Sequence, residues 1–387
     1  MGAENRYTSA DLMRKQNARS ILQVIHNEKG IYRKMVAVRT NLAAQTVTNI
    51  ITVLIDKGIV IENPLAICGK GRNPFALQIN YAGFYIISVQ ISNFSIDIFF
   101  NNLESEVLYE RHYEMDASSD ALDVLKNAVS DIYDKYCKEY IISAVVISEA
   151  GIVDEKNGIV IEDYTLKWHN LNIRKELSFL EVPILVLNDV NIIAHYENSA
   201  NKNNANFMVV KVDNGVGSAL VLDNRVLYSS NRVSGEFGHI TALKQNEEIQ
   251  CFCGRKNCIT QFISKGALKR RLKKSYAEIK HDVYSGVPGT RGIIEEIGSL
   301  IAPKLADFIV LLDLDRVILT GDVVEDFEDI IFPCIKSIIE KDISFWIPFN
   351  KLEVKKYDFF PKICSRYAID FYFSAENDLH FLWDTYL

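Results

Sequence analysis

The sequence predicts an α/β fold in which a small helical head precedes a larger body of alternating strands and helices. Apolar residues recur at helical spacing up to residue 56, whereas β-rich runs alternate with helical stretches from Phe84 onward. Net charge divides the chain at the same place, because residues 1–80 carry +6 and the remaining 307 residues carry −13. A basic segment attached to an acidic body is typical of a separate nucleic-acid-binding module, which the total of −7 conceals.

The composition excludes several other classes of protein. Hydrophobic residues make up 48% and charged residues 24%, as in ordinary globular proteins. No apolar run reaches the roughly 18 residues of a membrane helix, and the first residues lack the apolar core of a signal peptide. Seven cysteines are an odd and sparse set, which argues against a secreted disulfide framework. We therefore expect a cytoplasmic protein without a membrane partner.

The head is predicted to contain three helices and a tight turn. Asn17–Asn27 has apolar residues at helical spacing, and Arg33–Arg39 forms a short second helical stretch. Asn41 suits a left-handed turn before a third helix, which Gly58 ends. Two short helices joined by a tight turn describe a helix-turn-helix.

Two strand-like runs, IVIEN and FALQIN, follow the third helix and predict a hairpin, or wing, whose tip is basic. Amide side chains on the third helix suit adenine edges, and basic side chains suit phosphates. The alternative is a plain three-helix packing module with solvated polar residues. The residues that we expect to contact double-stranded operator DNA are Arg33, Lys34, Gln45, Thr46, Thr48, Asn49, Lys70 and Arg72.

The body is predicted to consist of two similar lobes, because β-rich stretches open near residues 84 and 207. We expect domains at 1–80, 81–200 and 201–387. The expected helix is Leu122–Tyr136, and the expected strands are Phe84–Ile91, Ser95–Asn101, Glu106–Tyr113, Ile141–Ser148, Ile184–Leu187, Phe207–Val212 and Ala219–Leu222.

The segment HITALKQNEEIQCFCGRKNC predicts a metal site. It places His239, Cys251, Cys253 and Cys258 within one short span. One imidazole and three thiolates match a closed, tetrahedral, structural Zn²⁺ site without an open position for water. The alternative is a loop whose free cysteines are buried as small hydrophobes.

A second group of polar residues follows a strand end. VPILVLNDVNIIAHYEN delivers Asn188 and Asp189 to the start of a helix, where α/β proteins often place ligand groups. The alternative for either residue is a helix N-cap. An amide and a carboxylate together suit vicinal hydroxyls, which both donate and accept hydrogen bonds.

Several of these segments resemble the ROK family (repressor, open reading frame, kinase). The resemblance is carried by IYRKMVAVRTNLAAQTVTNIITVLIDKGIVIE followed by GRNP, by SEAGIVD, and by GEFGH followed by CxCGxxxC. It implies a winged helix-turn-helix followed by a two-lobed, actin-like (sugar-kinase, ribonuclease H-like) body with a cleft. It also implies that sugar is bound by Gly151, Asn188, Asp189, Glu236 and His239.

The sequence departs from the family pattern at several positions. Tyr32 and Ala43 replace serines that cap helices, Asn257 replaces a glycine, and Thr260 replaces a glutamate that contacts sugar in relatives. The DxGGT phosphate loop of ROK kinases is replaced by VQISNFS, which contains neither aspartate nor glycine. We therefore expect no kinase activity.

The resemblance implies a sugar-responsive, DNA-binding transcriptional repressor of carbohydrate-utilisation genes, of the type that responds to xylose or N-acetylglucosamine. We expect it to act as a homodimer or higher homo-oligomer, with sugar binding between the lobes altering operator affinity. Two alternatives stay open. One is a ROK sugar kinase with a DNA-binding head, and the other is a regulator that has lost sugar binding and responds to a protein partner.

Overall fold

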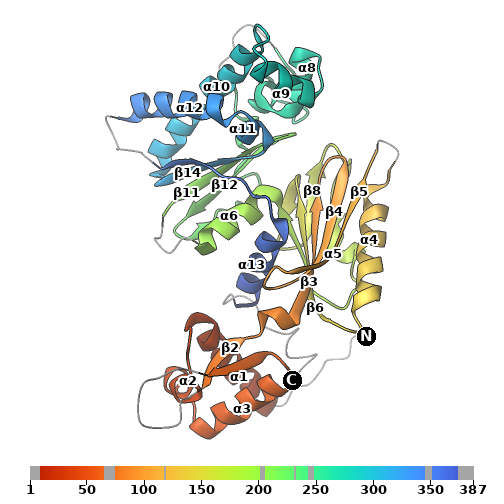
Figure 1. Cartoon of the computed structure of the whole chain (residues 1–387), viewed down its shortest axis with the longest axis vertical. Coiled ribbons are helices and arrows are strands. Elements are labelled where there is room, and N and C mark those ends of the chain that lie inside the picture. The colour runs from red at the N-terminus through yellow and green to blue at the C-terminus, as the bar shows by residue number, and fades with distance from the viewer. Residues whose placement is uncertain are drawn as a thin grey trace.

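The structure is a computed structural model and describes residues 9–64, 75–116, 119–200, 205–230, 232–242, 248–344 and 351–373. Three parts follow one another along its longest axis: a helical head, a first sheet and a second sheet (Figure 1). Lys70 and Arg72, expected at the hairpin tip, lie outside the described residues. Among the described helices, none is both long and apolar enough to cross a membrane.

The head consists of α1 (Ser9–Asn27), α2 (Arg33–Thr40) and α3 (Ala44–Asp56), followed by the antiparallel strands β1 (Val60–Pro64) and β2 (Phe75–Ile79). The start predicted at residue 17 was wrong, because α1 begins eight residues earlier. The added stretch SADLMRKQ lacks apolar periodicity but consists mostly of good helix formers.

The turns of the head follow local sequence chemistry. Asn41 ends α2 in the left-handed conformation with φ of 55°, and Gly58 follows α3 with φ of 71°. Tyr32 and Ala43 precede α2 and α3 and form no side-chain cap. Neither helix therefore has the side-chain cap that a serine would supply.

The first body sheet has the strand order β10-β6-β3-β4-β5, in which β3, β6 and β10 are parallel. Its alternating residues separate two faces: Ile87 and Val89 of β3 face the core beneath α4, whereas Phe84 and Ile86 face the core shared with α6 and α13. The bounds are β3 Phe84–Ile91, β4 Ser95–Asn102, β5 Val107–Glu114, α4 Ala121–Tyr136, β6 Ile141–Glu149, β10 Ile184–Asn188 and α6 Asp189–Ala200.

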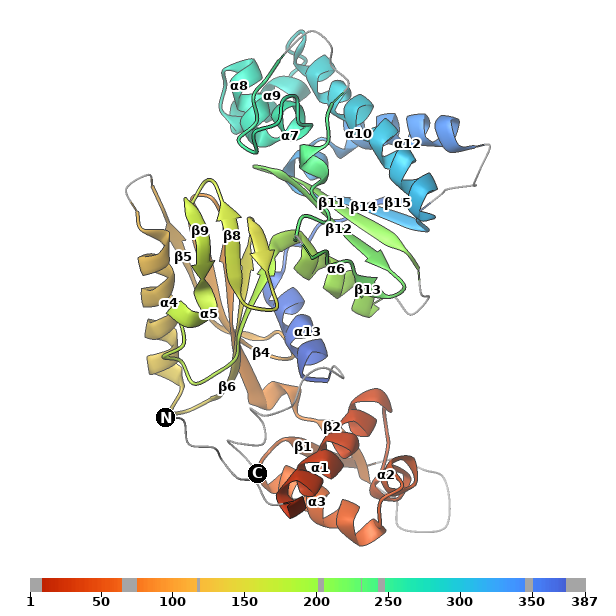
Figure 2. The same cartoon turned by 180° about the vertical axis from the view of Figure 1, so that it is seen from behind.

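A small antiparallel sheet extends from the carboxyl end of β6. It contains β7 (Ile152–Asp154), β8 (Ile159–Asp163) and β9 (Trp168–Asn172), and the short helix α5 (Ile173–Glu176) follows. This sheet lies on the side of the first lobe that faces the second lobe (Figure 2).

The second sheet has the order β13-β12-β11-β14-β15 and packs α6 on one face and α10 and α12 on the other. Helix α6 therefore lies between the two sheets (Figure 1). The bounds are β11 Phe207–Val212, β12 Val216–Leu222, β13 Arg225–Val226, α7 Thr260–Ile263, α8 Lys265–Leu272, α9 Tyr276–Tyr284, α10 Thr290–Leu312, β14 Arg316–Thr320, α11 Asp322–Asp326, α12 Glu328–Ile343, β15 Leu352–Val354 and α13 Phe360–Phe373.

Helix α13 returns from the second sheet to the first. Its Ser365 hydroxyl accepts a hydrogen bond from Asn101 of β4, and its Tyr372 hydroxyl donates one to the carbonyl of Ser143 in β6. The division expected at residue 200 thus separates α13 from the sheet against which it packs. The same hydrophobic core continues into the head, so head, α13 and first sheet are packed together.

Candidate ligand cavity and metal centre

A cavity of about 450 Å³ lies between the two lobes. Such a volume is typical of small-molecule sites. The structure brings all five residues that were expected to bind sugar to its wall, although they lie far apart in the sequence. They are Gly151, Asn188, Asp189, Glu236 and His239.

Asn188 at the end of β10 caps the helix that follows it. Its side-chain oxygen accepts hydrogen bonds from the backbone N–H groups of Val190 and Asn191, at 2.9 and 3.2 Å. Its amide nitrogen donates to the carbonyl of Gly151 at 3.0 Å. The N-cap alternative therefore applies to Asn188, and one amide hydrogen remains for a ligand.

Gly151 is required by close packing at this edge of the sheet. A Cβ at this position would lie 2.5 Å from the carbonyl oxygen of Glu162 and 2.9 Å from the carboxylate of Glu149. The Gly151 N–H donates to that carboxylate at 2.7 Å. Glu149 is fully buried. Burial is the main cause that raises its pKa well above the usual value, and the neighbouring Asp163 carboxylate raises it further.

Asp189 in the first turn of α6 forms an ion pair across the cavity. Its carboxylate lies 2.7 Å from the ammonium of Lys211 at the end of β11. Burial lowers the pKa of Lys211, but the charges of Asp189 and Asp213 outweigh that effect and leave it raised. Lys211 was not predicted from the sequence, although a charged residue in the otherwise apolar strand FMVVKV was a signal for it.

A half-buried carboxylate, Glu155, holds the Asn188 loop and connects it to the second lobe. Glu155 accepts hydrogen bonds from the Asn188 backbone N–H at 3.2 Å and from the Asn191 side chain at 2.8 Å. The Tyr228 hydroxyl, from the chain after β13, donates to its other oxygen at 2.5 Å. Burial raises the pKa of Glu155 despite these bonds.

Two glycines position Glu236 and His239 against the edge of β12. Gly235 adopts φ of 91°, and a Cβ there would lie 2.1 Å from the carbonyl oxygen of Ser218. A Cβ on Gly238 would lie 2.1 Å from the carbonyl oxygen of Val216. The side chains of Glu236 and His239 line the cavity, where burial and the charge of Asp189 raise the pKa of Glu236 to about 6.

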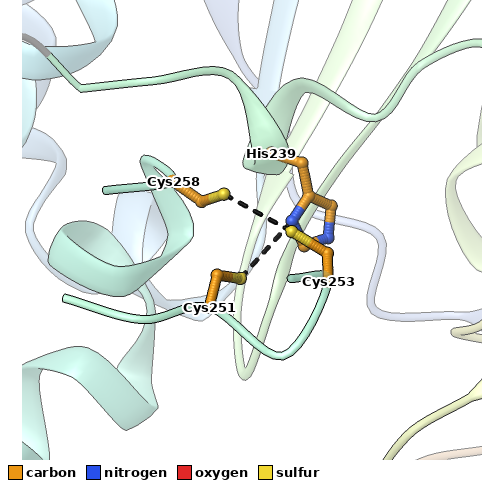
Figure 3. A group of neighbouring side chains, drawn as sticks. All are labelled: His239, Cys251, Cys253 and Cys258. Carbon is orange, nitrogen blue, oxygen red and sulfur yellow. Dashed lines mark hydrogen bonds between the residues drawn. The ribbon is translucent and has the colours of Figure 1, made fainter. Parts of the chain in front are cut away.

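The structure gathers His239, Cys251, Cys253 and Cys258 into a single group beside the cavity (Figure 3). Their ligand atoms all lie within 4.8 Å of one another. The Cys253 and Cys258 sulfur atoms are 3.6 Å apart, and Cys251 Sγ is 3.6 Å from Nδ1 of His239. These four side chains could hold a metal ion.

The other ring nitrogen of His239 faces the cavity, since Nε2 lies 3.7 Å from a carboxylate oxygen of Glu236. Asn257, which replaces the family glycine, adopts φ of 55°, and its side chain accepts a hydrogen bond from the Ile249 N–H at 2.8 Å. Thr260, which replaces the family glutamate, is buried and lines the cavity.

The expected DNA-contacting residues of the head occupy different environments. Lys34, Gln45, Thr48 and Asn49 are exposed and Thr46 is half-buried. Arg33 differs from the expectation of a free phosphate contact. Its guanidinium lies 3.0 Å from the Glu62 carboxylate and donates to the Thr48 carbonyl, which ties α2 to α3 and β1.

The sequence model of the ROK family matches residues 86–363 of the chain. The chain belongs to the ROK family. Its ROK body has the mixed α/β, sugar-kinase-like fold of that family. The sequence is 29% identical over 239 residues to the xylose repressor of Staphylococcus xylosus, an alignment that covers 59% of this chain and 61% of that protein. The chain thus spans less than two thirds of that relative's length.

A longer alignment joins this ROK protein to the DNA-binding transcriptional dual regulator NagC of Escherichia coli. Identity is 24% over 361 residues, covering 87% of this chain and 88% of NagC. The solved structure of a ROK family transcriptional regulator, a homologue of the Escherichia coli Mlc protein, has a TM-score of 0.79 at 21% identity and covers 96% of this chain and 99% of its own. A ROK hexokinase from Thermus thermophilus has a TM-score of 0.60 at 17% identity, with coverage of 73% and 96%.

Proposed function

We propose that this ROK protein is a sugar-responsive, DNA-binding transcriptional repressor of carbohydrate-utilisation genes. The observation that carries the proposal is the presence, in one packed chain, of a three-helix head with a two-stranded hairpin and of a polar cavity between the lobes. The names of the curated relatives, xylose repressor and transcriptional regulator, support the same function. Such a function places the protein in the cytoplasm.

We propose that the head is a winged helix-turn-helix. The tight turn at Asn41 separates α2 from α3, whose polar face carries the exposed Gln45, Thr48 and Asn49. Gln45 donates a hydrogen bond to Asn49 at 2.8 Å, so the two amides are already aligned on one helix face. That alignment suits paired hydrogen bonds to adenine in the major groove. Lys34, Lys70 and Arg72 are then assigned to the DNA backbone or the minor groove.

The proposed effector is a sugar held between the lobes. Asn188 and Asp189 belong to the first lobe, while Glu236 and His239 belong to the second. A ligand that binds groups of both lobes favours one arrangement of the lobes, and a homodimer or higher oligomer would pass that change to paired heads on a two-fold symmetric operator. Thr260 keeps open the alternative in which a protein partner replaces the sugar.

Two ion-pair clusters argue against phosphoryl transfer. The Asp189 carboxylate, which matches the general base of ROK kinases, is bound by Lys211 at 2.7 Å. In the second lobe Lys265 bridges Asp213 and Asp322, so its charge is already neutralised by two carboxylates and does not serve as a cation for a nucleotide phosphate. These contacts support a body that binds ligand without kinase activity.

We further propose that the His–Cys₃ group binds a structural Zn²⁺. Bonds of about 2.3 Å to sulfur and about 2.0 Å to nitrogen place tetrahedral ligand atoms roughly 3.5–3.8 Å apart. The two 3.6 Å separations in this cluster fit that geometry. Four protein ligands leave no open position, so the ion would fix the loop and the orientation of His239.

The proposal can be tested with DNA from the region upstream of the protein's own gene. We expect binding that exceeds binding to a shuffled fragment of equal composition at moderate salt, and we expect one of xylose, glucose or N-acetylglucosamine to weaken it. Equal affinity for both fragments would refute the DNA-binding function. Specific binding that responds to none of the sugars would favour the protein-partner alternative, and sugar-dependent ATP consumption would favour the kinase.

A further inference from the structure

Two large aromatic side chains line the cavity and are unusually exposed. Tyr164 has 49% of its surface accessible and Phe252 has 56%. Their ring centroids lie only 4.6 Å apart at an interplanar angle of 46°. Tyr164 follows β8 of the first lobe, whereas Phe252 belongs to the metal-binding loop of the second. The pair therefore joins the two lobes along one wall of the cavity.

Both aromatic residues are carried by anchored loops. Phe252 lies between Cys251 and Cys253, so a metal ion held by these ligands would fix the backbone on either side of it. Tyr164 lies in a turn in which the Asp163 carboxylate accepts hydrogen bonds from the backbone N–H groups of Thr165 and Leu166, both at 2.7 Å. Rigid support of an exposed apolar side chain is what a binding wall requires.

The aromatic pair is continuous with the polar part of the cavity. The Phe252 ring contacts the His239 ring edge-on, with centroids 5.1 Å apart and an interplanar angle of 85°. His239 in turn lies 3.7 Å from the Glu236 carboxylate. Polar groups that can bind hydroxyls thus adjoin an apolar surface within a single cavity.

We propose that Tyr164 and Phe252 form an aromatic wall that packs against the C–H face of a ring-form sugar. This inference rests on the proposed sugar-binding function and specifies which carbohydrates the site selects. A pyranose ring presents hydroxyls around its edge and a flat apolar surface on its face. An open-chain alditol with the same hydroxyls has no such fixed surface, so it gains little from the aromatic rings.

The test compares ring sugars with their alditols by calorimetry on the full-length protein. The probes are glucose and glucitol, xylose and xylitol, and N-acetylglucosamine and its alditol. The variants are Tyr164→Ala and Phe252→Ala, with Phe179→Ala as the matched control, because Phe179 is 53% exposed and does not line the cavity. Zinc content is measured for every sample, since Phe252 adjoins two metal ligands.

We expect the unchanged protein and the Phe179→Ala control to prefer one ring sugar over its alditol. Each wall variant should bind that sugar about tenfold more weakly while alditol affinity changes little. Unchanged ring-sugar affinity in Tyr164→Ala, which leaves the metal loop intact, would overturn the aromatic wall alone. Failure of the unchanged protein to bind any probe would overturn the sugar-binding function as well.

Discussion

His26 of α1 and Phe373 of α13 stack face to face, with ring centroids 4.1 Å apart and an interplanar angle of 2°. The edge of the imidazole is bound as well, because Nδ1 lies 2.6 Å from the Tyr81 hydroxyl at the start of the body. Helix α13 also packs against α6, whose first residues line the ligand cavity. A shift of α13, or a shift of α6 passed on through α13, would therefore change the contact with the head.

Removal of this stack should uncouple the head from the ligand cavity. We expect Phe373→Ala to bind sugar with the affinity of the unchanged protein and to bind operator DNA, but to show a smaller sugar-induced loss of DNA affinity. Paired titrations of sugar and DNA measure the coupling free energy, which is typically about 1–3 kcal/mol. A Phe373→Ala protein with full sugar response would show that the stack does not transmit the signal.

The same contact predicts a dependence of stability on pH. Burial lowers the pKa of His26, an effect partly opposed by the charge of Asp370. Because the unfolded chain binds this proton more readily, the free energy of unfolding should fall as pH decreases below about 6.5, until the lowered pKa is reached.

Chemical denaturation at pH 5 to 8 measures this effect against a His26→Phe variant, which keeps an aromatic ring without a titrating group. The variant should lose less stability than the unchanged protein between pH 6.5 and 5. Identical pH profiles for the two proteins would assign the dependence to other groups.

Loss of the metal should loosen the second-lobe side of the cavity. We expect Cys253→Ser to lose stoichiometric zinc, to have a lower Tm and to bind sugar more weakly, because His239 and Phe252 lose their common support. Cys137→Ser is the matched control, since Cys137 is exposed and lies outside the cluster. Equal zinc content in both variants, measured by metal analysis, would contradict the assigned ligand set.

We expect different residues of the head to determine DNA affinity and base preference. Lys34→Ala removes an exposed cation of α2, so we expect weaker binding to all DNA sequences and a salt slope smaller by about 1. Asn49→Ala should instead relax preference at one base pair, at a cost of about 1–3 kcal/mol for the correct operator. Competition binding over a salt series distinguishes them, and a loss of base preference in Lys34→Ala would reverse these roles.

We expect a buried carboxylate on α6, that of Glu197, to stabilise the folded protein. Glu197 is almost fully buried and binds Arg316 at 2.6 Å, Lys355 at 2.9 Å and the Tyr357 hydroxyl at 2.8 Å. Glu197→Ala leaves these groups without their anion and should lower the free energy of unfolding by about 3 kcal/mol. Glu295→Ala, which breaks the exposed pair with Arg291, should change it by less than about 1 kcal/mol. Denaturant titration measures both changes.

Local sequence patterns were sufficient to predict most elements. The strands Phe84–Ile91 and Phe207–Val212 were predicted to the residue, and β6 and α4 were predicted within one residue of their ends. Asn41 and Asn257 adopt the left-handed backbone expected of asparagine in tight turns. These features depend on side-chain chemistry and periodicity within a few residues, which a single sequence contains.

Other features depend on contacts between distant segments. Lys211 is a lone charge in an apolar strand until Asp189, 22 residues earlier, is placed opposite it. Tyr164 and Phe252 are two unrelated aromatic residues in the sequence, and only the approach of the lobes makes them a pair. Arg33 had the sequence character of a phosphate contact, but folding supplies Glu62 as its partner.

The sequence by itself determined the basic head, the α/β body and the set of one histidine and three cysteines. Each of these depends only on local composition and residue spacing. Only the tertiary structure decided that α13 closes back on the first sheet and reaches His26, and that two aromatic residues face one another across the lobes. Burial and long-range packing set these relationships, and neither is fixed by any short stretch of the chain.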